Sequence, residues 1–231
     1  MIMERVRTWS AVLAVGLLAM VLGGGSASAE VFFDLYGGAT NPGDPDVEVT
    51  REGQARQTER GSADTDFTVG GRGGYWFDRQ GLRWLGVALD ISYFEAEYTR
   101  EGGTGNVANV KVQTLPITPL VMLRLPLLES PQHPNGQLQL YTGAGPGIFI
   151  LDTTVRFRSG AGEVSESGAT IGLDFRAGVA YEFLPNWAAF VEYRFTYYSV
   201  EPEGRVDDRK TQVEADFDAH HVLFGISYRF R

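Results

Sequence analysis

Two side chains near the end of the chain could carry out hydrolysis together, because a histidine can take the proton of a serine that attacks an ester or amide. His221 and Ser227 are the candidate pair, and Asp174 or Glu192 could orient the histidine. The spacing argues against this chemistry, since six residues of extended strand span about 20 Å. The two side chains would share a face but lie far apart. We therefore predict no catalytic site and no enzyme activity.

Charged side chains of both signs recur at every second position in several segments, which places them on one face of an extended strand. Inside a narrow barrel such a face would have to form ion pairs, because an unpaired buried charge is costly. We expect structural ion pairs rather than a conducting path. The predicted cluster consists of Arg72, Asp90, Arg124, Asp174, Arg176, Glu192, Arg194 and Arg229.

Carboxylates also gather in two polar segments, where they could attract a divalent cation. Neither segment has the twelve-residue helix-loop-helix spacing of a common calcium site, and the chain has no cysteine for thiolate ligands or disulfides. We predict solvated acidic loops, no metal and no cofactor. The carboxylates are Asp44, Asp46 and Glu48 in the first segment, and Asp207, Asp208, Glu214, Asp216 and Asp218 in the second.

Strands with a period of two would position the charged cluster. Between 170 and 183 the apolar side chains from Ile171 to Phe183 alternate with a face that carries Asp174 and Arg176. This length suits a tilted strand that crosses a bilayer. Proline weakens the prediction of a strand at 110–125, and the glycine-rich strand at 138–153 has no assignable phase. The eight predicted strands lie at 31–40, 67–77, 82–99, 110–125, 138–153, 170–183, 187–200 and 219–230.

The connections between these strands alternate in length. Those at 78–81, 127–136 and 184–186 are short or moderate, whereas those at 41–66, 100–109, 154–169 and 201–218 are long and polar. Periplasmic turns and extracellular loops alternate in this way in bacterial membrane barrels. The fold class is therefore all-β: an eight-stranded antiparallel up-and-down transmembrane β-barrel with short periplasmic turns and four longer extracellular loops.

The beginning of the chain reads as a secretory signal. Arg5 and Arg7 precede an apolar run at 9–22, and small residues at 27–29 suit a signal peptidase. We expect a signal peptide at 1–29, cleavage between Ala29 and Glu30, and a barrel domain at 30–231; a retained anchor helix is the alternative. A net charge of −9 argues against a nucleic-acid partner.

A soluble eight-stranded barrel would place its apolar face inside and its charges outside. Three features favour the membrane version: charges of both signs share a face with small residues, glycine is frequent, and aromatic residues gather near strand ends as an interfacial girdle. The aromatic residues assigned to that girdle are Tyr75, Trp76, Phe77, Tyr93, Phe94, Tyr181, Phe183, Trp187, Tyr197, Tyr198, Tyr228 and Phe230.

The chain resembles the outer-membrane β-barrel superfamily that includes the outer membrane protein A transmembrane domain and the opacity proteins. The resemblance implies that the assembly machinery reads an aromatic residue closing the last strand, a role that Tyr228 and Phe230 match, although Arg231 follows them. It rests on the signal, on Leu115-Pro116-Ile117, on the run from Tyr141 to Gly147, on Glu192-Tyr193-Arg194-Phe195, and on the run from His221 to Phe230.

These observations lead us to expect a monomer in the cell outer membrane with a structural or surface-interaction, adhesion-like role carried by its extracellular loops. A small solute channel is the alternative, and a lipid A-modifying enzyme is a third. The expected partners are outer-membrane lipids, the barrel-assembly machinery during biogenesis, and an unknown extracellular partner. One sequence does not identify that partner, because function resides in the loops rather than in the fold.

Overall fold

The computed structural model describes residues 29–43, 46–51, 57–60, 62–77, 81–99, 107–157, 163–200, 203–206 and 209–230. The expected signal peptide therefore lies outside the described residues, apart from Ala29. The strands are β1 (Ala29–Pro42), β2 (Asp46–Arg51), β3 (Gln57–Arg60), β4 (Ser62–Asp64), β5 (Asp66–Phe77), β6 (Leu85–Thr99), β7 (Val107–Leu127), β8 (Leu138–Phe157), β9 (Glu163–Leu184), β10 (Trp187–Val200), β11 (Glu203–Val206) and β12 (Arg209–Phe230).

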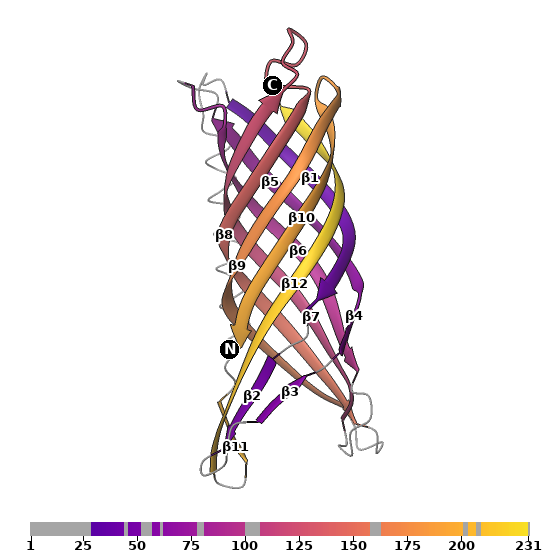
Figure 1. Cartoon of the computed structure of the whole chain (residues 1–231), viewed down its shortest axis with the longest axis vertical. Helices are drawn as coiled ribbons and strands as arrows, with labels where there is room; N and C mark the ends of the chain where they lie inside the picture. The colour runs from indigo at the N-terminus through magenta and orange to yellow at the C-terminus, as the bar shows by residue number, and fades with distance from the viewer. Residues whose placement is uncertain are drawn as a thin grey trace.

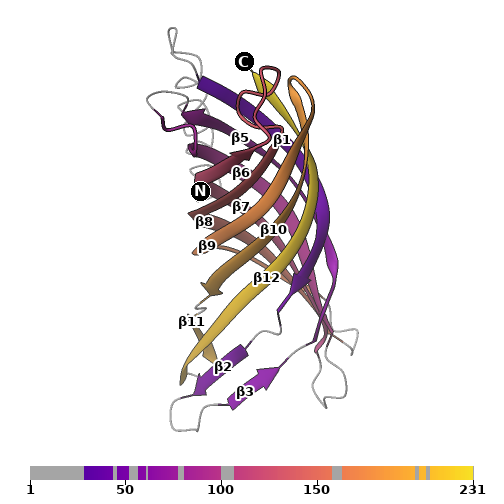
Figure 2. The same cartoon turned by 45° about the horizontal axis from the view of Figure 1, so that its top comes forward.

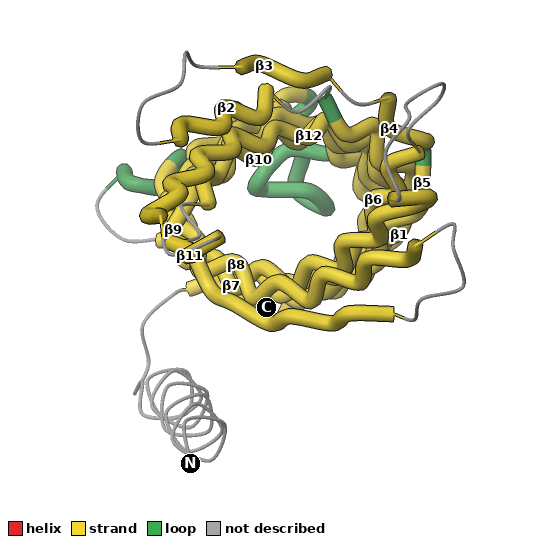
Figure 3. Tube along the Cα trace, turned by 90° about the horizontal axis from the view of Figure 1, so that it is seen from below, coloured by secondary structure: helices red, strands yellow, loops and turns green. Residues whose placement is uncertain are grey.

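Eight of these strands form a closed antiparallel barrel (Figures 1 and 2). β1, β5, β6, β7, β8, β9, β10 and β12 each pair with the next, and β12 pairs back onto β1 from Val31 opposite Phe230 to Pro42 opposite Ala219. The closed ring is seen along its axis in Figure 3. The predicted eight-stranded up-and-down barrel is confirmed. No helix in the described residues is long and apolar enough to cross a membrane.

The strands extend further on the side of the long connections, which we call the loop side, than the sequence predicted. β7 begins at Val107, β8 ends at Phe157, β9 begins at Glu163 and β12 begins at Arg209, all within segments expected to be loops. The same segments hold the short strands β2, β3, β4 and β11, which pair with β12, β2, β6 and β12 respectively. The described parts of the expected loops at 41–66, 100–109, 154–169 and 201–218 are thus mostly strand. The opposite end, where the strands join at 78–84, 128–137 and 185–186, we call the turn side.

The predicted faces are correct for most strands, because period-two alternation places apolar residues outside and polar residues inside. Leu35, Ile91, Val121, Phe175 and Phe224 are among the exposed outward side chains. The girdle assignment was wrong at three positions. Trp76, Phe94 and Tyr198 are buried inside the barrel, because in each case the neighbouring aromatic residue takes the outward position.

The proline-rich strand and the glycine-rich strand pair with each other. β7 and β8 are in register on either side of Pro119 and Pro146, with Ile117 opposite Ile148 and Val121 opposite Ala144. The two prolines face each other, and neither can donate a ladder hydrogen bond. A Cβ atom at Gly145 would lie 1.8 Å from the Pro119 carbonyl oxygen, so only glycine fits there. The sequence left open which residues of β8 face the lumen. In the structure Gln139, Tyr141, Phe149 and Leu151 lie inside.

Polar side chains mark the loop-side edge of the outer apolar surface. Glu95 and Lys111 form an ion pair of 2.5 Å, and both lie beyond Ile91 and Tyr93 on the outward face of β6 and its neighbour β7. Tyr93 and Gln113 also donate hydrogen bonds to Glu95. The hydrogen bond from Lys111 lowers the pKa of the Glu95 carboxyl, and the Tyr93 hydroxyl adds to this effect.

Replacing Lys111 with methionine should destabilise the folded protein by less than about 1 kcal/mol at neutral pH, since this pair is partly exposed. A lowered folded pKa contributes stability at neutral pH that is lost as the pH falls through that pKa. The difference between wild type and K111M should therefore shrink in acid. Urea unfolding at both pH values measures it, and a difference that grows in acid would contradict the assignment.

Candidate functional site: the filled lumen

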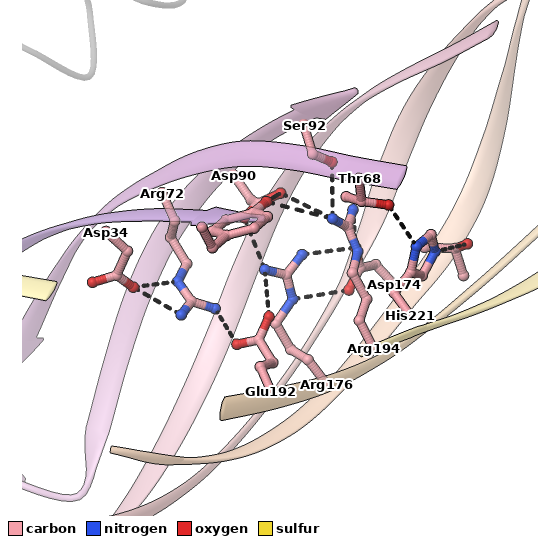
Figure 4. A network of polar contacts seen from close by, with 12 residues as sticks. Asp34, Thr68, Arg72, Asp90, Ser92, Asp174, Arg176, Glu192, Arg194 and His221 are labelled. Carbon is pink, nitrogen blue, oxygen red and sulfur yellow. Dashed lines mark hydrogen bonds and ion pairs between the residues drawn. The ribbon is translucent and has the colours of Figure 1, made fainter. Parts of the chain in front are cut away.

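Three arginines and four carboxylates fill the middle of the barrel (Figure 4). Arg72 binds Asp34 at 2.8 Å and Glu192 at 2.7 Å, and so joins β1, β5 and β10. Tyr141 donates a hydrogen bond of 2.8 Å to the same Glu192 oxygen. The guanidinium of Arg72 also lies 5.5 Å from the centre of the Phe190 ring. We call this group, with the Arg176 and Arg194 contacts below, the central layer.

Arg176 has the largest set of partners in the central layer. Its guanidinium binds both oxygens of Asp174 at 3.0 and 2.8 Å, binds Asp90 at 2.8 Å, and lies 3.5 Å from Glu192. Arg194 completes the group with an ion pair of 2.6 Å to Asp174. All of these side chains are fully buried. Such a network is tolerable in a low-dielectric interior only because each charge faces an opposite one.

A second group of charges closes the turn side and is called the turn-side layer. Glu30 pairs with Arg124 at 2.9 Å and with Arg229 at 3.2 Å. Arg229 also pairs with Glu182 at 3.1 Å. Arg124 lies 4.5 Å from the centre of the Trp76 ring, a cation–π distance. The three ion pairs tie β1, β7, β9 and β12 together at the end of the ring.

The connection between β7 and β8 folds over this layer and caps the lumen. In the view along the axis, a green loop lies inside the outline of the ring (Figure 3). Asn135 is buried and donates a hydrogen bond to Glu30. His133 contacts Glu182 through a hydrogen bond of 2.7 Å. Leu128 begins the connection with φ of 56°, an unusual conformation for a residue with a side chain. This connection, predicted as an ordinary turn, is therefore a plug of the turn side.

His221 lies in a third layer, on the loop side of the central layer. Its Nδ1 atom is 2.9 Å from the Thr40 hydroxyl and 3.1 Å from the Thr68 hydroxyl, and its Nε2 atom is 3.2 Å from the Thr196 hydroxyl. The register places His221 opposite Thr40 but Ser227 opposite Asp34, six residues away along β1. The structure thus does not bring His221 and Ser227 together, and both are buried.

All eight residues of the predicted charged cluster point inward and are buried, but the structure divides them between two layers. Arg124 and Arg229 belong to the turn-side layer, and the other six belong to the central layer. The prediction missed Glu30, Asp34 and Glu182, which supply partners to both layers. Their alternation with inward neighbours on the predicted strands could have identified Asp34 and Glu182.

The acidic segments contribute little to the described site. Asp44, Asp207 and Asp208 lie outside the described residues, and only the backbone is described at Asp46, Glu48 and Glu214. Asp218 lies 3.4 Å from His220 on the outer surface. Tyr193 forms a hydrogen bond of 2.6 Å with the other side of that imidazole.

A closed barrel with an apolar outside and an ion-paired inside is the arrangement of a membrane barrel. The family model described as outer membrane protein beta-barrel domain matches residues 15–230. The chain belongs to this family. It is therefore an outer-membrane β-barrel protein, as the sequence resemblance implied.

The chain is similar to several solved structures, and it shares its fold with the first of those described next. The outer membrane protein OprG from Pseudomonas aeruginosa is 21% identical with a TM-score of 0.58, over 90% of this chain and 98% of that chain. Neisserial surface protein A is 15% identical with a TM-score of 0.44, over 90% of this chain and 100% of that one. Ail from Yersinia pestis is 15% identical with a TM-score of 0.39, over 87% and 98%. No curated protein sequence matches the chain.

Proposed function

We propose that this outer-membrane barrel serves as a closed scaffold that presents its loop-side strands at the cell surface for interaction with an extracellular partner. The observation that carries this proposal is the filled lumen. Six carboxylates and five guanidiniums are buried among the described residues, and the β7–β8 connection covers the turn side. An eight-stranded barrel is only wide enough for side chains to fill. The arrangement therefore favours a surface role over the alternative of a solute channel.

The loop-side architecture supports the same role. Several barrel strands continue past the polar edge marked by Glu95 and Lys111, and β2, β3 and β11 add further paired strands to the end of β12. Paired strands hold a surface in a fixed shape, so a partner would lose less conformational entropy on binding than with free loops. A catalytic role has less support, because His221 and Ser227 lie apart.

The proposal includes the steps of export. The signal peptide would be cleaved between Ala29 and Glu30, the barrel domain would comprise 30–231, and the assembly machinery would read Tyr228 and Phe230 in the closing strand. Phe230 is exposed on the outward face at the end of β12, where such a machine could reach it. The mature protein would act as a monomer in contact with outer-membrane lipids, without a nucleic-acid partner.

Cysteine labelling tests the orientation. The chain has no cysteine, so single substitutions give an unambiguous signal. Ser167 lies on the loop side of β9 and Glu129 lies in the turn-side connection, and both are exposed. The two test variants are Ser167→Cys and Glu129→Cys. A membrane-impermeant maleimide applied to intact cells should label S167C strongly and E129C only after lysis. Labelling of E129C on intact cells would overturn the proposed orientation.

Adhesion measurements then test the surface role itself. Cells that display wild-type protein should be retained on surfaces coated with extracellular matrix or serum proteins more than cells whose barrel lacks residues 46–60. Labelling of S167C in the shortened variant provides the control for display. Equal retention at equal display on every surface would reject the adhesive role of this segment.

A further inference from the structure

A small cavity separates the central layer from the turn-side layer. Its volume is about 20 Å³, and its polar lining residues are Asp34, Arg72, Gln139, Tyr141, Ser227 and Arg229. Ala180 and Met122 contribute part of the apolar lining. A cavity needs roughly 10–15 Å³ to hold one water molecule. This cavity is therefore large enough for one water and too small for any organic ligand.

Two buried polar atoms of these lining residues have no hydrogen-bond partner among the residues that the structure describes. They are Oδ1 of Asp34, which can only accept, and Nε of Arg229, which can only donate. The other carboxylate oxygen of Asp34 binds Arg72, and Nη1 of Arg229 binds Glu30 and Glu182. Leaving such atoms unsatisfied in a buried site is costly, and more so for charged groups.

We infer that this cavity binds a single water molecule, which donates a hydrogen bond to Asp34 Oδ1 and accepts one from Arg229 Nε. The chemistry of the two atoms selects the occupant. A sodium ion could bind the carboxylate oxygen but could not accept from the N–H group, and a chloride ion could do only the reverse. Water does both, and the Ser227 hydroxyl can supply a third contact, which suits the usual two to four partners of a buried water.

This site goes beyond the proposed surface role, because it concerns how the filled lumen holds together. Asp34 pairs with Arg72 in the central layer, and Arg229 pairs with Glu30 and Glu182 in the turn-side layer. The bound water would join Asp34 of one layer to Arg229 of the other. The cap and the central ion pairs would then belong to one hydrogen-bonded network.

Nuclear Overhauser measurements on the methyl-labelled protein in lipid nanodiscs test the site directly. The methyl groups of Ala180 and Met122 should show cross-peaks to a long-lived water. Leu223 is fully buried and does not line the cavity, so its methyl groups provide the control and should show none. Absence of cross-peaks at both Ala180 and Met122 would overturn the inference.

Filling the cavity gives a second, independent result. Ala180→Val adds two carbons to the lining without removing a hydrogen-bonding group, and should displace the water. The Met122 cross-peak should then disappear, and the urea midpoint should fall because Asp34 and Arg229 lose their partner. A dry cavity predicts a rise of the midpoint instead, which would contradict the inference. If A180V does not refold, the wild-type cross-peaks alone decide.

Discussion

Replacing Arg176 with methionine should destabilise the folded barrel by about 3–5 kcal/mol, because it leaves buried carboxylates without their shared partner. Arg176 contacts Asp90, Asp174 and Glu192. Without it, Glu192 keeps Arg72, and Asp90 and Asp174 must share Arg194. The loss should appear as a lower urea midpoint in lipid vesicles, read from the unheated and heated electrophoretic forms and from circular dichroism.

The matched control removes a different charge from a different place. Lys111→Met deletes an ion pair on the outer surface and should cost less than about 1 kcal/mol. Arg176→Met combined with Asp90→Asn should recover part of the loss, since one of the two carboxylates that then share Arg194 becomes neutral. If R176M were no more destabilising than K111M, the central layer would not be the stabilising network that its geometry indicates. Should R176M fail to refold, R176K gives a milder test of the same contacts.

The second large effect concerns ion flow. Refolded wild-type protein in a planar bilayer should produce no current steps. The cap and the ion-paired layers behind it block the lumen in series. Deleting residues 129–135 removes the cap but leaves Arg72 and Glu192 in the central layer, so the current should remain at baseline. Combining this deletion with Arg72→Ala and Glu192→Ala removes an ion pair without changing the net charge, and discrete current steps should appear.

Two results would oppose this account. Current steps from the wild-type protein would mean that the ion-paired lumen conducts, which would favour the channel over the surface role. Steps from the cap deletion alone would mean that the central layer does not block the lumen. Circular dichroism on each sample shows that the barrel is folded, so that leakage from misfolded protein is not counted.

The alternation of apolar and polar residues along the strands made most of the barrel predictable. On β9 the positions from Thr170 to Glu182 keep a strict period of two, since one face meets lipid and the other meets the lumen. Beyond the membrane both faces meet water, so the pattern disappears although the backbone pairing continues. This is why the strand parts at 163–169 and 209–218 were expected to be loops.

The layers inside the lumen were only partly predictable. Inward charges follow from strand phase, but which charges meet depends on register and barrel stagger, which a single sequence does not provide. The cap escaped prediction for a different reason. Asn135 and His133 look like ordinary turn residues, and their contacts with Glu30 and Glu182 cross the barrel between segments far apart in the chain.

The pairing of β12 with β1 gives the barrel a circular order of strands. Val31 lies opposite Phe230, so the first and last strands begin and end side by side on the turn side. The seam between β12 and β1 joins the first barrel strand to the last, so it cannot form before β12 has been synthesised. β12 and β1 are paired in the same antiparallel way as the neighbouring strands that a turn-side connection joins. A short linker between them, with new ends opened at residues 185 and 186, would leave every neighbouring pair of barrel strands intact in a circularly permuted chain.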